Sequence, residues 1–217
     1  MLTDSYQTIA SPSEGEYKEK GSKFLAYAYP MDAESDLDGF IASLRDIHPK
    51  ARHYCYAYKL GLDGTRFRAN DDGEPSGTAG KPIYGQILSF GLTNVCIIVI
   101  RYFGGTKLGA SGLIHAYKEA SKAALDNAAI IEKYLYISYQ LTFGYDHMGH
   151  IMNALKDPDI EITDKVFEDH CAVTIQVRLS AEDKTIHRLK AHLLNKSLEE
   201  VTSETVVDFC EMVRKER

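Results

Sequence analysis

The sequence predicts an α+β protein made of two domains. Both parts of the 217-residue chain combine the apolar–polar alternation of strands with the three-to-four-residue apolar spacing of helices. The pattern changes near Tyr134, after a long alanine-rich helix, and a chain of this length suits one large domain or two small ones. We therefore expect an N-terminal domain over residues 1–133 and a C-terminal domain over residues 134–217.

The N-terminal part is expected to form, in order, strands over 14–20 and 23–30, a helix ending before Pro49, strands over 53–60 and 65–69, a helix over 81–91, a strand over 94–100 and a helix over 112–129. Gly21-Ser22 between the first two strands is a hairpin signal. The first helix is predicted by the helical spacing of its apolar residues, which are Leu37, Phe40, Ile41, Leu44 and Ile47. The nearly continuous apolar run over 94–100 indicates a strand buried on both faces.

Three tyrosines, Tyr54, Tyr56 and Tyr58, share one face of the strand over 53–60. Aromatic side chains on a sheet can stack on the bases of single-stranded RNA, or they can pack beneath a helix. Packing is the favoured interpretation, because half-buried strands are rich in aromatic residues in general.

The C-terminal part is expected to be a ferredoxin-like domain with the order β-α-β-β-α-β. Its predicted elements are a strand over 135–143, a helix begun by Asp146, strands over 160–167 and 171–179, a helix that follows Ser180, and a last strand over 205–209. Ser180 and Asp183 have the spacing of a capping box at the start of the second helix.

The charge is unevenly distributed along the chain. The formal net charge is −6. Residues 134–217 carry ten basic and fifteen acidic residues, whereas residues 1–133 are nearly balanced with fifteen and sixteen. Any anion-binding surface should therefore be a local patch on the N-terminal part.

Four cysteines are present, and none has the spacing of a metal site. They are expected to be reduced and buried. The N-terminus lacks the pattern of a signal peptide, and the longest apolar run, 95–100, is far shorter than the ~20 residues of a membrane-spanning helix. We expect a soluble cytoplasmic protein with no membrane partner, no metal or other cofactor and no identifiable catalytic residue.

Two glycine-rich segments, residues 77–82 and 101–112, each lead into a predicted helix. The first amides of a helix have no acceptor within it and carry partial positive charge, and glycines let the preceding backbone curl around a bulky anion. Lys81 and Lys107 add full charges, and Arg101 ends the strand before the second segment. Neither segment matches a P-loop or a dinucleotide fingerprint. The alternative is that the glycines serve only turns and packing.

An acidic loop holds Asp71, Asp72 and Glu74. Clustered carboxylates can bind Mg²⁺ or act as acid and base. The alternative is a solvated turn, or carboxylates that cap a helix or pair with Arg66 and Arg68.

The segments described above resemble the YigZ/IMPACT family. The matching stretches are residues 21–27, 53–58, 70–83, 99–113 and 115–117. The resemblance implies an N-terminal domain with the fold of domain four of elongation factor G and a C-terminal domain similar to domain five of that factor. It also implies a link to the control of translation.

The motifs and the resemblance together predict an anion- or RNA-binding surface made of His53, Arg68, Gly80, Lys81, Arg101, Tyr102, Gly104, Gly105, Lys107, Gly109 and His115. Two positions depart from the family pattern, since Ser111 stands where a second glycine is usual and His115 where arginine is usual. A histidine near its ordinary pKa of ~6.5 is mostly neutral at pH 7, which weakens the case for phosphate binding at His115.

The favoured function is a translation-linked binding factor that contacts RNA or ribosome phosphates through the two glycine-rich helix starts. One alternative is a Mg²⁺-dependent enzyme that acts on a phosphorylated small molecule. The other is a factor that binds a protein of the translation apparatus and uses its glycines only structurally.

Overall fold

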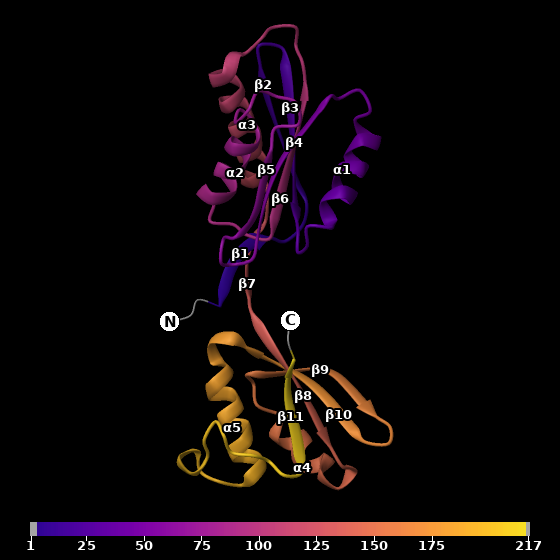
Figure 1. Ribbon diagram of the computed structural model, residues 1–217, viewed down its shortest axis with the longest axis vertical. Helices are drawn as coiled ribbons and strands as arrows, with labels where there is room; N and C mark the ends of the chain where they lie inside the picture. The colour runs from indigo at the N-terminus through magenta and orange to yellow at the C-terminus, as the bar shows by residue number, and fades with distance from the viewer. Residues whose placement is uncertain (1–3, 216–217) are drawn as a thin grey trace. The chain divides into compact units, whose positions relative to one another are not determined.

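The chain forms two compact units, and the computed structural model describes residues 4–215 of it. The N-terminal unit is Tyr6–Lys133, and the C-terminal unit holds the residues from Tyr134 onward together with Asp4 and Ser5 (Figure 1). Asp4 and Ser5 therefore do not belong with the first predicted domain. Residues 1–3 and 216–217, which the predicted domains include, lie outside the described residues.

A five-stranded antiparallel sheet forms the centre of the N-terminal unit, with the strand order β2-β3-β6-β4-β5. Its strands are β2 (Ser13–Glu19), β3 (Ser22–Pro30), β4 (His53–Leu60), β5 (Arg66–Asn70) and β6 (Val95–Tyr102). The predicted hairpin between β2 and β3 is confirmed, because Glu19 pairs with Ser22 across a turn in which Gly21 has φ +80°.

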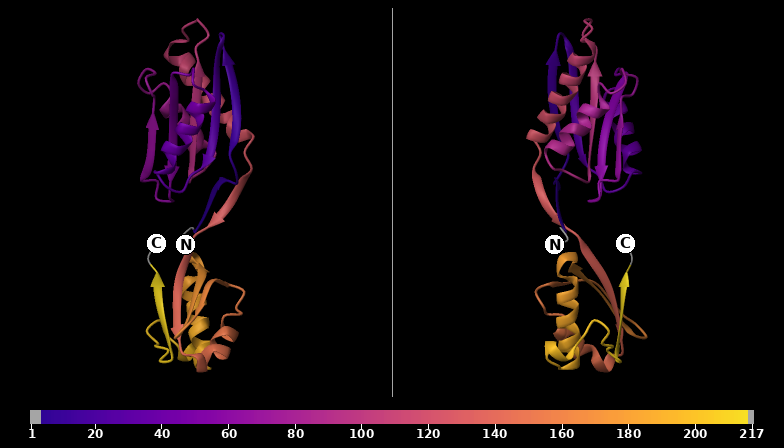
Figure 2. Two further views of the ribbon diagram at one scale, coloured as in Figure 1. Left: turned by 90° about the vertical axis from the view of Figure 1, so that its right-hand side faces the viewer. Right: turned by 60° about the vertical axis from the view of Figure 1, so that its left-hand side comes forward.

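Helices cover both faces of this sheet (Figures 1 and 2). They are α1 (Asp36–Ile47) on one face, and α2 (Gly80–Ser89) and α3 (Gly109–Asp126) on the other. As predicted, β6 is buried on both faces, since Ile97 and Val99 pack toward α2 and α3 while Ile98 and Ile100 pack toward α1. The α3 helix begins and ends one turn earlier than the predicted range 112–129.

The tyrosine face of β4 packs beneath α1. Tyr54, Tyr56 and Tyr58 are at most 7% exposed and share one core cluster with Leu37 and Leu44 of α1. The favoured interpretation of packing is confirmed, and stacking of RNA bases on these rings is wrong because the rings are covered.

The C-terminal unit contains a four-stranded antiparallel sheet with the order β11-β8-β10-β9. Its elements are β8 (Tyr136–Phe143), α4 (Met148–Ala154), β9 (Ile160–Phe167), β10 (Cys171–Arg178), α5 (Glu182–Leu194) and β11 (Cys210–Lys215). This succession is the β-α-β-β-α-β order that the sequence predicts. Three short 3-10 turns complete the unit. Tyr145–His147 precedes α4, Leu179–Ala181 precedes α5, and Leu198–Glu200 precedes the final loop.

The last predicted strand is misplaced. Residues 205–209 form no strand and lie between two turns, one closed by the Thr205 N–H and the Thr202 carbonyl (3.1 Å) and the other by the Cys210 N–H and the Val207 carbonyl (3.0 Å). The strand β11 starts only after the second turn. Two further strands, β1 (Ser5–Ile9) and β7 (Ile130–Tyr134), pair with each other and were not predicted, because β7 is almost wholly exposed and lacks an alternating pattern.

The predicted helix caps of the C-terminal unit are also wrong. Ser180 and Asp183 form no capping box, because the Ser180 N–H donates to Asp4 Oδ2 (2.9 Å). Asp146 lies within a 3-10 turn and makes no capping hydrogen bond. The capping box of this unit is formed by Ser197 and Glu200.

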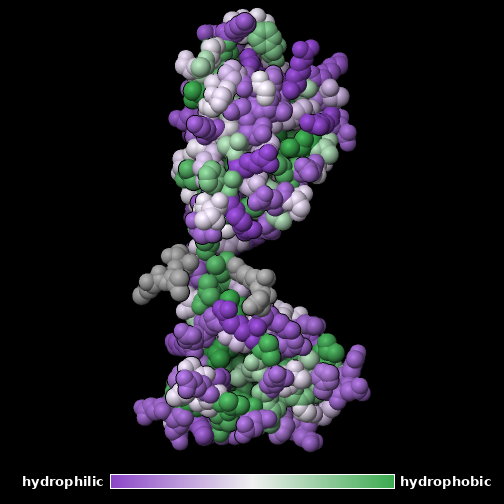
Figure 3. Space-filling view, in the orientation of Figure 1, coloured by the Kyte–Doolittle hydropathy of each residue, from purple (hydrophilic) through white to green (hydrophobic). Residues whose placement is uncertain are grey.

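Hydrophilic and hydrophobic residues are interspersed on the visible face of both units (Figure 3). Among residues 4–215, no helix combines the length and the apolar composition needed to cross a bilayer.

Candidate functional site

The acidic loop closes the N-terminus of α2. Asp71 Oδ1 accepts the N–H groups of Ala79 and Gly80, each at 2.9 Å, and Oδ2 accepts the Gly77 N–H at 2.8 Å. The amides that were expected to bind an external anion are therefore occupied by a carboxylate of the chain itself. The Gly80 amide is therefore not free for an external anion, and the geometry does not support its predicted role in an anion-binding site.

The electrostatics of Asp71 agree with this capping role. Burial opposes ionisation of the carboxyl group, but the N–H donors of Gly77, Gly80 and Ala79 outweigh burial and hold its pKa below the usual value. Lys81 adds a smaller effect in the same direction. The side chain of Lys81 therefore lies near a site that already holds a negative charge.

The other two carboxylates of the loop, those of Asp72 and Glu74, bind different parts of the N-terminal unit. Asp72 Oδ2 accepts the Tyr54 N–H at 2.6 Å, and the Asp72 carbonyl lies 2.8 Å from His53 Nδ1. Glu74 is buried and faces Arg101. Among the described residues, no group of three His, Cys, Asp or Glu side chains is placed to hold a metal ion. The geometry of the loop gives no support to the Mg²⁺ alternative.

Arg101 forms a buried ion pair. Its Nη1 lies 2.6 Å from Glu74 Oε1, and both side chains are less than a tenth exposed. Tyr117 Oη donates to the same carboxylate oxygen at 3.0 Å. Arg101 was predicted to bind an external anion, and the geometry does not support that role because Glu74 already neutralises its charge. The expected pairing of the loop with Arg66 or Arg68 is replaced by this pair.

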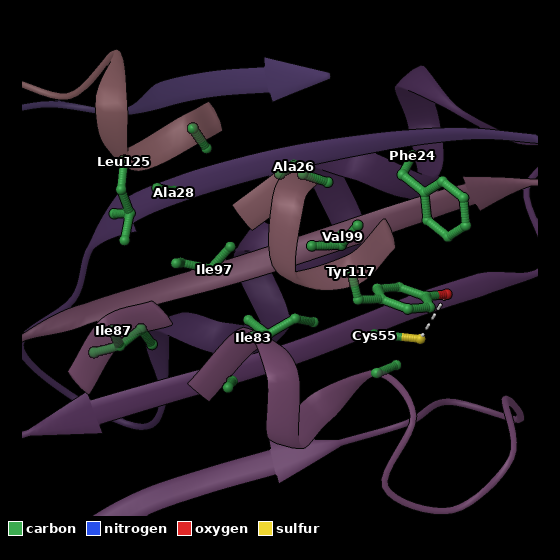
Figure 4. Close-up of a cluster of buried hydrophobic side chains, with 14 of the residues drawn as sticks. Phe24, Ala26, Ala28, Cys55, Ile83, Ile87, Ile97, Val99, Tyr117 and Leu125 are labelled. Carbon is green, nitrogen blue, oxygen red and sulfur yellow. Dashed lines mark hydrogen bonds between the residues drawn. The ribbon is translucent and has the colours of Figure 1, made fainter. Parts of the chain in front are cut away.

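A buried thiol completes this network beneath α2 and α3. Cys55 Sγ lies 3.3 Å from Tyr117 Oη, the contact that is dashed in Figure 4. The same sulfur lies 2.9 Å from the Asp71 carbonyl oxygen. Burial raises the pKa of the Cys55 thiol far above its ordinary value. Cys55 is therefore a structural residue, because a nucleophilic cysteine needs an accessible thiolate.

The segment before α3 is anchored at its start. Tyr102 Oη lies 3.0 Å from His48 Nδ1, and the other ring nitrogen of His48 lies 2.7 Å from Tyr27 Oη. The Gly104 N–H donates to Ser22 Oγ at 3.1 Å, and a Cβ at Gly104 would lie 1.9 Å from the Gly21 carbonyl carbon. Tyr102 therefore anchors the start of the loop to His48, and Gly104 holds the loop against the β2–β3 turn.

Beyond Gly104 the backbone is open. None of the amides of residues 105–111 donates a hydrogen bond to an acceptor in the part of the chain that the structure describes, and α3 has no side-chain cap. Almost all of these residues are exposed. Gly105 and Gly109 have φ of +87° and +72°, a left-handed conformation that favours glycine. This helix start, unlike that of α2, has unpaired amides that face solvent.

The predicted basic side chains do not all meet at this opening. Lys107 is exposed within it. Arg68 lies on β5 with its guanidinium 5.9 Å from the centre of the Tyr56 ring, on the α1 side of the sheet. The His115 ring makes an edge contact with Tyr17 at 5.6 Å. Of the predicted surface, the structure brings Gly105, Lys107 and Gly109 together at the start of α3.

Sequence reasoning missed the role of the β2–β3 turn. Lys20 is exposed in this turn, and no described acidic side chain pairs with it. The turn contacts Gly104 through Gly21 and Ser22. The stretch over residues 21–27 resembles the family, but the contact of this turn with the glycine-rich segment is seen only in the structure.

Comparisons with known proteins agree with the resemblance. The Impact N-terminal domain matches residues 20–125. The chain is 33% identical over 183 residues to the IMPACT family member YvyE of Bacillus subtilis, covering 84% of this chain and 82% of that protein. It is 32% identical over 180 residues to the IMPACT family member YigZ of Escherichia coli, covering 82% and 87%.

A solved structure agrees over the whole length. A crystal structure described as that of an hypothetical protein has a TM-score of 0.71 and 27% sequence identity, and the match covers 99% of each chain. The fold is therefore shared along both units. From the domain match and from relatives more than 30% identical over most of their length, the chain belongs to the IMPACT family.

Proposed function

We propose that this protein is a translation-linked binding factor whose N-terminal unit holds RNA phosphates at the start of α3. The observation that carries the proposal is the run of unpaired, exposed amides over residues 105–111. The N-terminus of a helix attracts anions, because its free N–H groups point outward and the helix dipole adds partial positive charge.

Two lysines strengthen this site. Lys107 lies within the open segment, and Lys20 lies in the β2–β3 turn that contacts Gly104. Neither lysine pairs with a carboxylate of the described residues. A site made of backbone amides and lysines recognises phosphate without reading bases, so we expect binding without strong sequence preference.

The proposal also includes the finer fold expected from the family. We infer that the N-terminal unit corresponds to domain four of elongation factor G, and that the C-terminal unit is a ferredoxin-like domain similar to domain five. The β-α-β-β-α-β order and the strand order β11-β8-β10-β9 support the second inference. Such a pair of domains suits a partner on the ribosome or another part of the translation apparatus.

The central test removes a single amide without changing a charge. Proline is tolerated in the first turn of a helix and lacks the N–H group. Ala110→Pro should therefore keep α3 and weaken binding of a fluorescent single-stranded RNA severalfold at low salt. Ala110→Ser, which keeps the amide, is the matched control and should bind like the unmodified protein.

A charge reversal gives a second test. Lys107→Glu should weaken RNA binding at every sequence tested, and it should lower the slope of log affinity against log salt by roughly 0.7 for each phosphate that the protein no longer neutralises. Lys59→Glu, at the far end of β4 from His53, is the control. If neither RNA nor ribosomes bind the unmodified protein at low salt, or if both lysine variants weaken binding equally, the proposal fails.

A further inference from the structure

A cavity in the C-terminal unit is built from residues other than those of the proposed RNA site, which belongs to the N-terminal unit. It has a volume of about 710 Å³ and is bounded by one side of α5, by residues 202–208 and by β11. Cavities that bind small molecules typically measure about 300–1,000 Å³. The size therefore suits a small organic ligand.

The floor of this cavity is apolar. Val207 and Cys210 are buried members of the core cluster of the unit, and the half-buried Ile186 and Met212 pack against that cluster. Figure 3 shows hydrophobic residues among hydrophilic ones on the face where α5 and β11 lie. A ligand here would bury hydrocarbon against Ile186 and Met212.

The rim of the cavity is strongly acidic. Five carboxylates line it, and the single lysine among the lining residues, Lys190, donates to the Ser203 carbonyl at 2.6 Å. The five are Glu182, Asp183, Glu204, Asp208 and Glu211. Glu182 is already used, because it pairs with Arg214 at 2.7 Å and accepts the Tyr139 hydroxyl at 2.7 Å.

The other four carboxylates make no ion pair with a residue that the structure describes. Asp183 has a structural reason for its position, because the first turn of a helix favours negative charge. Glu204, Asp208 and Glu211 come from the loop and from β11, and no helix start accounts for them. Their shared feature is that they surround the same apolar floor.

Several carboxylates around an apolar floor suit an organic cation that carries both hydrocarbon and more than one positive charge. Among residues 4–215, no group of three His, Cys, Asp or Glu side chains is placed to hold a metal ion. We propose that this cavity binds an aliphatic chain that carries two or more ammonium groups, as in a polyamine. The methylene groups would lie on the floor, and the ammonium groups would pair with Asp208, Glu211 and Glu204.

The same chemistry could come from a free amine or from lysine side chains of a peptide. We would titrate the full chain with spermidine, and separately with a blocked Lys-Val-Lys peptide, and follow amide chemical shifts by NMR. In either arm, the shifts should concentrate on α5 and on residues 202–212. Tighter binding of spermidine identifies a free amine as the source, and tighter binding of the peptide identifies a polypeptide.

A matched pair of triple variants tests whether the cavity is the site. Glu204→Gln/Asp208→Asn/Glu211→Gln should weaken binding about tenfold, because exposed charge pairs contribute modestly and their contributions accumulate. Glu161→Gln/Asp164→Asn/Glu168→Gln removes the same charge from exposed positions on and beside β9 and should change affinity less than twofold. Ile186→Phe should weaken binding by filling the floor, without altering its salt dependence.

The proposal is overturned if neither probe binds. It is also overturned if both triple variants weaken binding equally, since the attraction would then be the net negative charge of the chain and not this cavity. These results are independent of the RNA experiments, which alter only residues of the N-terminal unit.

Discussion

Arg101 and Glu74 form a buried ion pair in which Arg101 Nη1 lies 2.6 Å from Glu74 Oε1. The two residues come from the second glycine-rich segment and from the acidic loop, which were predicted to be separate sites. The pair joins the acidic loop to the end of β6, and Tyr117 of α3 donates to the same carboxylate. One contact therefore ties together the loop, the sheet and the helix whose start remains open. The pair positions the proposed RNA site without touching the ligand.

Breaking this pair should destabilise the N-terminal unit strongly. Glu74→Gln leaves the Arg101 charge buried without a counter-ion, and the free energy of unfolding should fall by about 3–5 kcal/mol. Chemical denaturation followed by circular dichroism measures this decrease. The double variant Glu74→Leu/Arg101→Met, which removes both charges, should recover much of the stability.

The exposed pair Lys122–Asp126 provides the control for that experiment. Both of its side chains are about half exposed, so Asp126→Asn should lower stability by no more than about 0.5 kcal/mol. Equal effects of Glu74→Gln and Asp126→Asn would show that the Arg101–Glu74 pair is not buried as described.

Replacing Asp71 should weaken the start of α2 in a pH-dependent manner. Asp71→Asn loses charge-assisted acceptance of the Gly77, Ala79 and Gly80 amides, and stability at pH 7 should fall by about 1–3 kcal/mol. The pKa of Asp71 is lowered in the folded protein, so its contribution is complete above the unfolded pKa of ~3.9 and is lost as the pH falls through the folded pKa.

The difference in unfolding free energy between the unmodified protein and Asp71→Asn should therefore stay constant from pH 7 to about 5 and shrink below about 4. Asp46→Asn, an exposed position on α1, should show little difference at any pH. A difference that grew on acidification would contradict the capping role of Asp71.

The parts of the fold that depend on burial periodicity were predictable. The β2–β3 hairpin, the doubly buried β6 and the tyrosine face of β4 each follow from the spacing of apolar residues, because one face of each element must be covered. The β1–β7 pair was not predictable in this way. β7 is nearly all exposed and is held by backbone pairing, which leaves no apolar pattern in the sequence.

The candidate site could be predicted from the sequence only in part. Glycine and lysine near a helix start predicted two open anion sites, but only the folded structure shows that Asp71 folds back onto one of them. Both helix starts have similar glycine-rich sequences. The two helix starts differ because the Asp71 carboxylate reaches the amides of α2, whereas no described carboxylate reaches those of α3. The direction of the Asp71 side chain depends on the tertiary path of the loop and not on local residue spacing.

Gly104 should tolerate no side chain. A Cβ at this position would lie 1.9 Å from the Gly21 carbonyl carbon and 2.2 Å from the Ser22 nitrogen, and backbone atoms cannot move aside cheaply. Gly104→Ala should destabilise the N-terminal unit by about 3 kcal/mol or more and should disturb the β2–β3 turn in NMR spectra. It should also weaken RNA binding, because Lys20 and the open amides would separate.

Gly39→Ala is the matched control for that variant. Gly39 lies within α1, and a Cβ there would meet no heavy atom within 4 Å. Alanine should stabilise this helix by roughly 0.5–1 kcal/mol, because glycine loses more backbone entropy on folding. Thermal unfolding of the two variants should thus move the midpoint in opposite directions.

The four cysteines should be inert in the folded protein. Cys55, Cys96 and Cys171 are fully buried and Cys210 is 3% exposed. Burial raises the pKa of Cys55 and Cys96 strongly, and that of Cys210 to about 11, so little thiolate forms at pH 8. In the native protein, a thiol reagent should react only when local opening of the fold exposes a cysteine. In the unfolded protein, the reagent should react with all four thiols at once.

The order in which the cysteines react with the thiol reagent should differ between the two units. Cys55 and Cys96 lie in the sheet of the N-terminal unit, whereas Cys210 begins the edge strand β11 beside the cavity proposed to bind amines. Local opening of an edge strand needs less free energy than opening of a central one. Mass spectrometry should therefore find Cys210 modified first, and spermidine should slow that reaction if it binds the cavity. Immediate reaction of Cys55 would instead show that the Tyr117–Glu74 network is open to solvent.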